Sequence, residues 1–239
     1  MNNSLDQFIS DLNTLNITLN DQQLSQFVNY FDLLVDWNSR MNLTSITEFD
    51  QVLKKHFVDS ISLLSYESIS SSSKIIDVGT GAGFPGIPLK ILLPDTEIVL
   101  MDSLNKRITF LNEVISNLNL KNICAIHSRA EDLSMNNNHR EAYDYCVSRA
   151  VANLSTLSEY CLPFVKLGGK FISYKSGDYD KELSDSKNAI NILGGNILKV
   201  ESFNLPDTDI SRAFVFIEKV NKTTLKYPRK GALPKNKPL

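Results

Sequence analysis

The chain has 239 residues, of which 42% are hydrophobic and 22% are charged. These values are typical of a globular protein in water, and the length allows one large domain with a modest extension. No apolar run approaches the roughly 20 residues of a membrane span, and the N-terminus lacks the basic and apolar parts of a secretion signal. The sequence therefore indicates a cytoplasmic protein and excludes a membrane-spanning one.

The net charge of −2 hides an asymmetry along the chain. From Lys219 to the end there are seven Lys or Arg residues and no acid, which leaves 18 basic against 27 acidic residues before it. A basic tail on an acidic body favours a polyanionic partner. A solvated tail kept only for solubility stays the alternative.

The cysteines and histidines indicate neither disulfides nor a metal site. Cys124, Cys146 and Cys161 stand among apolar neighbours without paired spacing, which is typical of reduced core residues. The three histidines are far apart in the sequence. We therefore expect no bound metal.

Residues 1–73 are predicted to form a helical segment packed on the main domain. Apolar residues recur at helical spacing on both sides of the segment WNSRMNLTSIT (37–47), which breaks the period and predicts a loop. The helix predicted after this loop carries His56 on its apolar face, and Asp59 lies in the same helix. We interpret these two residues as polar groups that hold a domain junction, with a catalytic role as the alternative.

A glycine-rich turn follows a buried strand predicted over 74–78. Glycines at such a turn let backbone N–H groups and a helix N-terminus approach a ligand closely. The spacing also fits a dinucleotide-binding turn. However, Asp77 at the end of the strand is typical of S-adenosylmethionine sites, where an ammonium group must be held. The candidate cofactor-binding residues here are Asp77, Gly79, Gly81 and Gly83.

From residue 74 onward, strands and helices alternate. The alternation implies a mostly parallel sheet of seven strands with helices on both faces and an antiparallel edge strand. We expect an α/β domain over 74–220, followed by a basic tail over 221–239. The further predicted strands are 97–101, 122–126, 143–147, 170–174, 195–203 and 212–219, and the helices among them are 104–118, 153–166 and 179–192.

Acidic residues follow the second and third predicted strands, at the edge where ligands bind in such sheets. Asp102 lies 23 residues after Gly79, close to the offset of roughly 20 expected for a carboxylate that binds ribose. It can also cap the following helix. Ala130 and Glu131 are placed to meet an adenine ring, and the alternative for Glu131 is a charge at a helix start.

Seven motifs of the chain are DVGTGAGFPGIPL, DSLNKRITFL (102–111), RAEDL (129–133), SRAVANL (148–154), WNSRMNLTSIT, HFVDSISLL (56–64) and KYPRK (226–230). Together they resemble the bacterial small-subunit ribosomal RNA methyltransferases that modify guanine at N7, also called glucose-inhibited division protein B. The resemblance covers nearly the whole chain. It implies a class I methyltransferase with a Rossmann-like fold, S-adenosylmethionine as methyl donor, and 16S ribosomal RNA or the small ribosomal subunit as partner.

The resemblance also assigns cofactor contacts to individual positions. They fall on Gly79, Phe84, Ala130, Glu131 and Arg149. The chain departs from the family pattern in its tail, which has Gly-Ala after the basic pair where Pro-Gly is common. It departs again at 175–177, where Lys-Ser-Gly stands in place of Lys-Gly.

The residues after the fourth predicted strand favour N7 as the methylated atom. Ser148-Arg149-Ala150 stands where enzymes that methylate exocyclic amines carry an Asp/Asn-Pro-Pro-aromatic element. Cys146 lies inside the strand, where burial would make it inert as a nucleophile. Guanine N7 has an in-plane lone pair and no proton to lose, so alignment suffices. We therefore expect no acid–base catalyst, and Arg149 and Lys175 would position phosphate or guanine.

Because the major groove of an RNA helix is too deep and narrow to read, the target should be splayed out of a loop or flipped. We expect a monomer whose phosphate contacts, besides Arg149, come from Lys106, Arg107, Arg212, Lys226, Arg229 and Lys230. One alternative is a non-catalytic RNA-binding or assembly factor, which the intact glycine turn disfavours. The other is an NAD-dependent oxidoreductase, for which no Tyr-x-x-x-Lys element follows.

Overall fold

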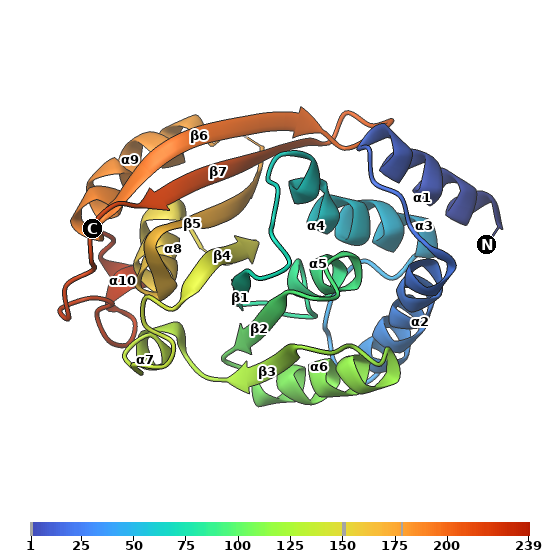
Figure 1. Cartoon of the computed structure of the whole chain (residues 1–239), viewed down its shortest axis with the longest axis horizontal. Coiled ribbons are helices and arrows are strands. Elements are labelled where there is room, and N and C mark those ends of the chain that lie inside the picture. The colour runs from blue at the N-terminus through green and yellow to red at the C-terminus, as the bar shows by residue number, and fades with distance from the viewer. Residues whose placement is uncertain (1, 150–151, 178) are drawn as a thin grey trace.

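The computed structural model describes residues 2–149, 152–177 and 179–239 (Figure 1). Ala150, which the sequence places after the fourth strand, lies outside these residues. No helix in the described ranges has the length and apolar character that crossing a membrane requires.

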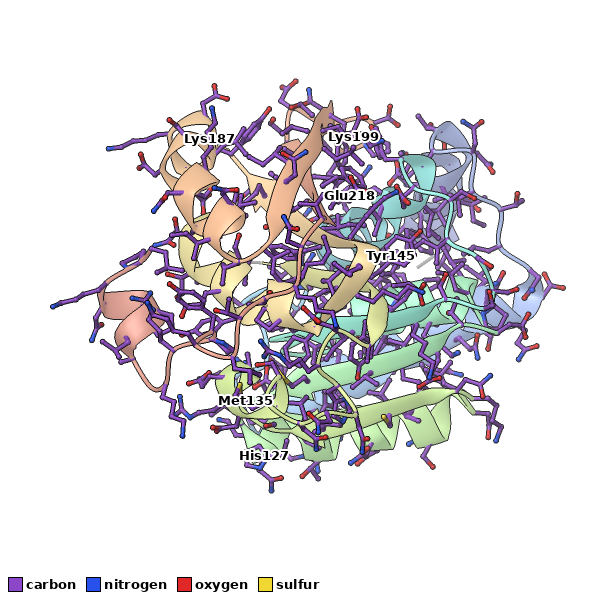
Figure 2. All side chains as sticks on the ribbon, turned by 60° about the vertical axis from the view of Figure 1, so that its left-hand side comes forward. His127, Met135, Tyr145, Lys187, Lys199 and Glu218 are labelled. Carbon is purple, nitrogen blue, oxygen red and sulfur yellow. The ribbon has the colours of Figure 1, made fainter. Side chains whose placement is uncertain are left out.

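A seven-stranded sheet runs through the molecule with the strand order β3-β2-β1-β4-β5-β7-β6. Strands β1 to β5 pair in parallel, whereas β7 runs antiparallel between β5 and the edge strand β6. The predicted class, a mostly parallel α/β sheet with an antiparallel edge strand, is confirmed. In Figure 2, His127 at the end of β3 and Lys199 on β6 mark the two edges. The strands are β1 (Lys74–Val78), β2 (Glu97–Asp102), β3 (Ile123–His127), β4 (Tyr143–Arg149), β5 (Val165–Ser176), β6 (Gly195–Asn204) and β7 (Ser211–Lys219).

The strand order reverses at β1, which lies between β2 and β4. Ile76 of β1 pairs with Val99 on one side and with Cys146 on the other. In open α/β sheets the ligand binds outside the carboxyl ends of the strands at such a reversal. The glycine turn follows β1 directly, so the fold places it at this position.

Helices cover both faces of the sheet (Figure 1). Neighbouring residues of a strand point to opposite faces, and Ile75 and Ile76 of β1 accordingly enter different cores. The core around Ile75 includes Phe27 and Phe57 of the N-terminal helices. The predicted boundary at residue 73 stays a prediction, because residues on its two sides share this core. The helices after β1 are α5 (Gly86–Leu92), α6 (Asn105–Asn117), α7 (Ala130–Leu133), α8 (Leu154–Cys161), α9 (Asp180–Ile192) and α10 (Leu233–Asn236).

The N-terminal segment is helical, as predicted. Helix α2 begins with a capping box, in which the side chains of Asn20 and Gln23 each accept a hydrogen bond from the other's backbone N–H. It continues through Asn38, so the predicted loop starts two residues later than expected. The third predicted helix is continuous but changes type along its length. The elements are α1 (Asn2–Thr14), α2 (Asp21–Asn38), α3 (Phe49–Val52), the π-helical η1 (Leu53–Val58), α4 (Asp59–Ile61) and the 3₁₀ turn η2 (Ser62–Ser65).

The helix predicted over 153–166 is wrong at its end. Helix α8 stops at Cys161, a 3₁₀ turn η3 (Leu162–Phe164) follows, and β5 already begins at Val165. Pro163 explains the difference, because its ring has no N–H and interferes with the carbonyl one turn earlier in a continuing helix.

The C-terminal tail is anchored to the rest of the molecule by an ion pair with a buried glutamate and by hydrogen bonds to its backbone carbonyls. Arg229 donates from Nε and Nη2 to the two carboxylate oxygens of Glu159, at 2.9 and 2.7 Å, and its backbone N–H donates to the same carboxylate at 2.7 Å. Glu159 on α8 is fully buried. Nη2 of Arg140 donates to the carbonyls of Thr223 and Tyr227. The tail therefore has a fixed path along α8.

Candidate active site

A cavity of about 320 Å³ lies at the carboxyl ends of β1, β2 and β3. Gly79, Asp102, Ala130 and Glu131, all predicted to contact a cofactor, line it together. Tyr160 of α8 contributes to the same wall. The sequence analysis missed Tyr160, because its place depends on how α8 packs and no motif surrounds it.

The glycine turn is held against β2 by its own backbone. Gly79 and Thr80 both donate their N–H to the carbonyl of Met101, at 2.9 and 3.1 Å. Gly83 has a φ of +100°, and a Cβ there would lie 2.7 Å from the hydroxyl of Tyr30. A side chain at this position would be both strained and crowded, which explains the glycine.

Asp102 connects the glycine turn to the start of α6. Its Oδ1 accepts from the N–H of Leu104 at 2.9 Å, and its Oδ2 accepts from the N–H of Gly81 and from Nη1 of Arg107, both at 3.0 Å. The N-cap of α6 is Leu104 and the helix has no side-chain cap, so Asp102 holds the residue that precedes the helix instead of capping it. A carboxylate has about four acceptor positions, so a lone pair remains for a ligand, and the predicted contact with ribose stays a prediction.

Asp77 is fully buried behind the glycine turn. Its Oδ2 accepts from Oγ1 of Thr80 at 2.6 Å and from the N–H of Gly86 at 2.8 Å. Its Oδ1 has no hydrogen-bond partner among the described residues. Burial raises the pKa of Asp77 to about 7, although the two hydrogen bonds oppose the rise. The carboxylate thus shapes the turn and keeps one oxygen without a partner.

A second cavity, of about 410 Å³, opens at the ends of β4 and β5 beside the N-terminal helices. It brings together Arg149, Lys175 and Arg212 with His56 and Asp59. Arg149 and Lys175 were predicted as positioning residues. Lys175 forms an ion pair with Glu182 at 2.6 Å in the same wall.

Asp59 holds two arginines in this wall. Its Oδ2 accepts from Nη1 of Arg149 at 3.2 Å and from Nε of Arg212 at 3.0 Å. Nη2 of Arg149 lies 3.0 Å from Nδ1 of His56, and Nε2 of His56 lies 2.8 Å from Oγ1 of Thr44. A guanidinium can only donate, so Nδ1 accepts and the ring proton sits on Nε2. Burial, helped by the charge of Arg149, lowers the pKa of His56 to about 3, which keeps the ring neutral.

Phe84, predicted to contact the cofactor, lies on the side of the second cavity. The ring of His56 stacks on it at 4.5 Å, and the guanidinium of Arg149 lies 5.1 Å from its centre. Arg149, predicted to contact the cofactor as well, lines the second cavity and not the first. Oγ of Ser148 donates to the carbonyl of Val78 at 2.7 Å. The ends of β4 and β1, which carry walls of the two cavities, are therefore directly joined.

The predicted RNA contacts divide into exposed lysines and paired arginines. Lys106, Lys226 and Lys230 are exposed. The arginines are each bound to a buried carboxylate: Arg107 to Asp102, Arg212 to Asp59 and Arg229 to Glu159. The structure thus gives the arginines a structural role, and all six RNA contacts stay predictions. Within the described ranges, no cluster of His, Cys, Asp or Glu could hold a metal ion.

Comparison with protein families gives one clear match. The family model described as GidB, rRNA small subunit methyltransferase G, matches residues 23–215. A protein of Lachnoclostridium phytofermentans named ribosomal RNA small subunit methyltransferase G is 53% identical over 97% of this chain and 96% of its own length. One of the same name from Desulforamulus reducens is 51% identical and covers 92% of each chain.

Solved structures share the fold at low sequence identity. TYW2 of M. jannaschii in complex with AdoMet has a TM-score of 0.57 and 13% identity, over 74% of this chain and 80% of that one. An O-methyltransferase of Thermotoga maritima, described as SAM-dependent, has a TM-score of 0.55 and 14% identity, over 80% and 72%. These likenesses show a methyltransferase fold.

Proposed function

The chain belongs to the rRNA small subunit methyltransferase G family. We therefore propose that it transfers the methyl group of S-adenosylmethionine to N7 of a guanine in 16S ribosomal RNA. The observation that carries the proposal is the pair of cavities at the strand reversal. One is lined by Gly79 of the glycine turn and by Asp102, and the other by Arg149, Arg212 and Lys175. The link between Ser148 and Val78 joins the two strand ends that carry them.

The residues of the first cavity fit S-adenosylmethionine. Asp77 does not line this cavity but lies buried behind the glycine turn, and its Oδ1 has no partner among the described residues, which an ammonium group held at the turn would satisfy. Asp102 has an acceptor position left for ribose hydroxyls, and Ala130 and Glu131 would address the adenine. Bound there, the cofactor would supply a methyl group activated by its sulfonium. Gly79, which lines the cavity, would lie beside its amino-acid end, and contacts of Gly81 and Gly83 with the cofactor are part of the proposal.

In the second cavity, Arg149 and Lys175 would bind the target nucleotide, and Arg212 is held beside them by Asp59. Asp59 and His56 orient the guanidinium of Arg149 through hydrogen bonds, and the ring of Phe84 packs against it. An arginine fixed in this way presents a planar fork of donors for phosphate or for a guanine edge. We therefore assign Arg149, predicted as a cofactor contact, to positioning the target.

No residue of this wall is arranged as a general base among the described residues. His56 uses Nδ1 to accept from Arg149 and Nε2 to donate to Thr44, and Asp59 is bound by two arginines. Guanine N7 needs no base, because it has no proton to lose. Alignment of the lone pair is the contribution that such a site makes to the rate.

The RNA would approach with its target guanine splayed out of a loop or flipped. The exposed Lys106, Lys226 and Lys230 would contact phosphates around the cavities. Each of these contacts is electrostatic and independent of sequence. We expect the protein to act as a monomer in the cytoplasm.

Nucleoside mass analysis of 16S ribosomal RNA tests this function. RNA from cells that lack the protein is compared with RNA from the same cells complemented by it. We expect one 7-methylguanosine to be lost and then restored. Equal 7-methylguanosine in both samples would contradict the proposal, and would favour the alternative of a non-catalytic assembly factor.

A further inference from the structure

Helix α2 is hydrogen-bonded to the methyltransferase unit through side chains on one face. Nε2 of Gln23 donates to the carbonyl of Ile91 at 3.0 Å, and Nε2 of Gln26 donates to the carbonyl of Leu118 at 2.9 Å. These carbonyls lie at the ends of α5 and α6, where a helix lacks donors of its own. Residues three and four apart share a helix face, and the next position on this face is Tyr30.

Tyr30 reaches past the helix ends into the glycine turn. Its hydroxyl donates to the backbone carbonyl of Ala82, and its side chain is fully buried. The ring stacks on Phe57 at 5.2 Å and lies 5.6 Å from Phe84. Burial raises the pKa of Tyr30 well above its usual value, so the hydroxyl keeps its proton and remains a donor.

This contact acts on one peptide group of the turn. The peptide bond is planar, so fixing the carbonyl of Ala82 also fixes the N–H of Gly83. That N–H donates to the carbonyl of Thr80 at 2.9 Å. A Cβ on Gly83 would lie 2.7 Å from the hydroxyl of Tyr30, so the tyrosine packs directly against this peptide. The peptide is therefore held from both of its polar ends.

We propose that Tyr30 is a positioning residue for S-adenosylmethionine, which fixes the Ala82–Gly83 peptide and so preorganises the glycine turn. The proposal rests on the proposed function. Preorganisation strengthens binding because the ligand does not have to order the loop itself. It also gives the N-terminal helices a part in cofactor binding, although they line no part of the first cavity.

The test compares Tyr30→Phe with the matched control Gln26→Met in the full chain. Tyr30→Phe keeps the ring and its stacking and removes only the donor to Ala82. Gln26→Met removes a donor from the same helix face, but its acceptor lies outside the turn. Affinity for S-adenosylmethionine is measured by calorimetry, and exchange of the Gly83 and Phe84 amide hydrogens is measured without ligand.

We expect about a tenfold loss of affinity in Tyr30→Phe, as for one lost hydrogen bond, and faster exchange at both amides. Gln26→Met should bind within about twofold of wild type. Each affinity is corrected for the folded fraction from near-ultraviolet circular dichroism, because unfolded chain lowers only the competent population.

The outcomes separate this inference from the proposed function. If the unaltered protein does not bind S-adenosylmethionine, the proposed function itself fails. If it binds and Tyr30→Phe binds equally well, the positioning role is wrong. Equal losses in Tyr30→Phe and Gln26→Met would reduce Tyr30 to a general contribution to stability, which also overturns the inference.

Discussion

Asp59 lies 3.2 Å from Arg149, through its Oδ2 and the Nη1 of the arginine. The side chains of both residues are largely buried. This contact joins the N-terminal helices to the end of β4 and thereby fixes the guanidinium in the wall of the second cavity. The arginine that we assign to the target nucleotide is therefore oriented by a part of the chain outside the sheet.

Replacing Asp59 by Asn should lower the rate of methylation while S-adenosylmethionine still binds. The two arginines would lose the charge that orients them, and charge-assisted hydrogen bonds of this kind are worth roughly 1.5–3 kcal/mol. We expect kcat/KM for RNA to fall about 10- to 100-fold. The matched control is Asp36→Asn, which removes the exposed ion pair with Arg40 and should change neither quantity. Unchanged kcat/KM in Asp59→Asn would contradict the assignment.

Asp102→Ala should weaken S-adenosylmethionine binding about 10- to 100-fold, because a charge-assisted hydrogen bond is lost. The variant also loses the hydrogen bonds that Asp102 accepts from the N–H groups of Leu104 and Gly81, so its unfolding free energy should fall by about 1 kcal/mol or more. Calorimetry and denaturant unfolding measure the two effects separately. A stability loss with unchanged affinity would show that Asp102 only supports the fold.

Lys226→Gln combined with Lys230→Gln should weaken RNA binding and flatten its salt dependence. Each phosphate contact that is lost lowers the slope of log affinity against log salt by about 0.7–0.9. The comparison variant is Arg229→Gln, which leaves the buried Glu159 unpaired and should lower the stability instead. If the lysine variant keeps the slope of the unaltered protein, the tail does not contact RNA.

The pH dependence of stability should reveal the buried carboxyl group of Asp77. Its pKa rises from 3.8 to about 7 on folding, so the folded state retains a proton that the unfolded chain has released between these values. The raised pKa of Asp77 therefore makes its full contribution to the unfolding free energy below about pH 4. This contribution is lost as the pH rises to about 7.

In Asp77→Asn that pH-dependent contribution is absent. The unfolding free energy of the variant, measured relative to the unaltered protein by urea titration, should thus rise across the same window and level off above it. The offset at any single pH reflects the altered hydrogen bonds, so only the slope is diagnostic. A difference that does not change with pH would mean that Asp77 has an ordinary pKa in the folded protein.

The first cavity could largely be predicted from the sequence because local segments supply it. The glycine turn follows the buried strand β1 directly and Asp102 ends the neighbouring strand β2, and the parallel sheet brings them together. The second cavity could not be assembled in this way. Asp59, Arg149 and Arg212 come from a helix and two strands that are distant in the chain, and only packing brings them together.

The pairing of the arginines with buried carboxylates could not be predicted from the sequence either. Charge and position suggested phosphate contacts for Arg107, Arg212 and Arg229, yet each is bound to a carboxylate that the fold buries. Burial of an acidic residue depends on tertiary packing, so the composition of the basic tail did not reveal Glu159 as a partner. Among the described residues no buried carboxylate pairs with the exposed lysines, and for them the interpretation from charge remains useful.

The central claim is that alignment of N7 with the methyl group, without a general base, is enough for the reaction. Single-turnover methylation across pH tests this claim most directly, with S-adenosylmethionine saturating and the product digested to nucleosides. We expect 7-methylguanosine as the product and a rate that stays flat above neutral pH, because no proton is removed from N7 and His56 remains neutral. A rate that keeps rising with pH, or a methyl group recovered on an exocyclic amine or a pyrimidine carbon, would contradict the account.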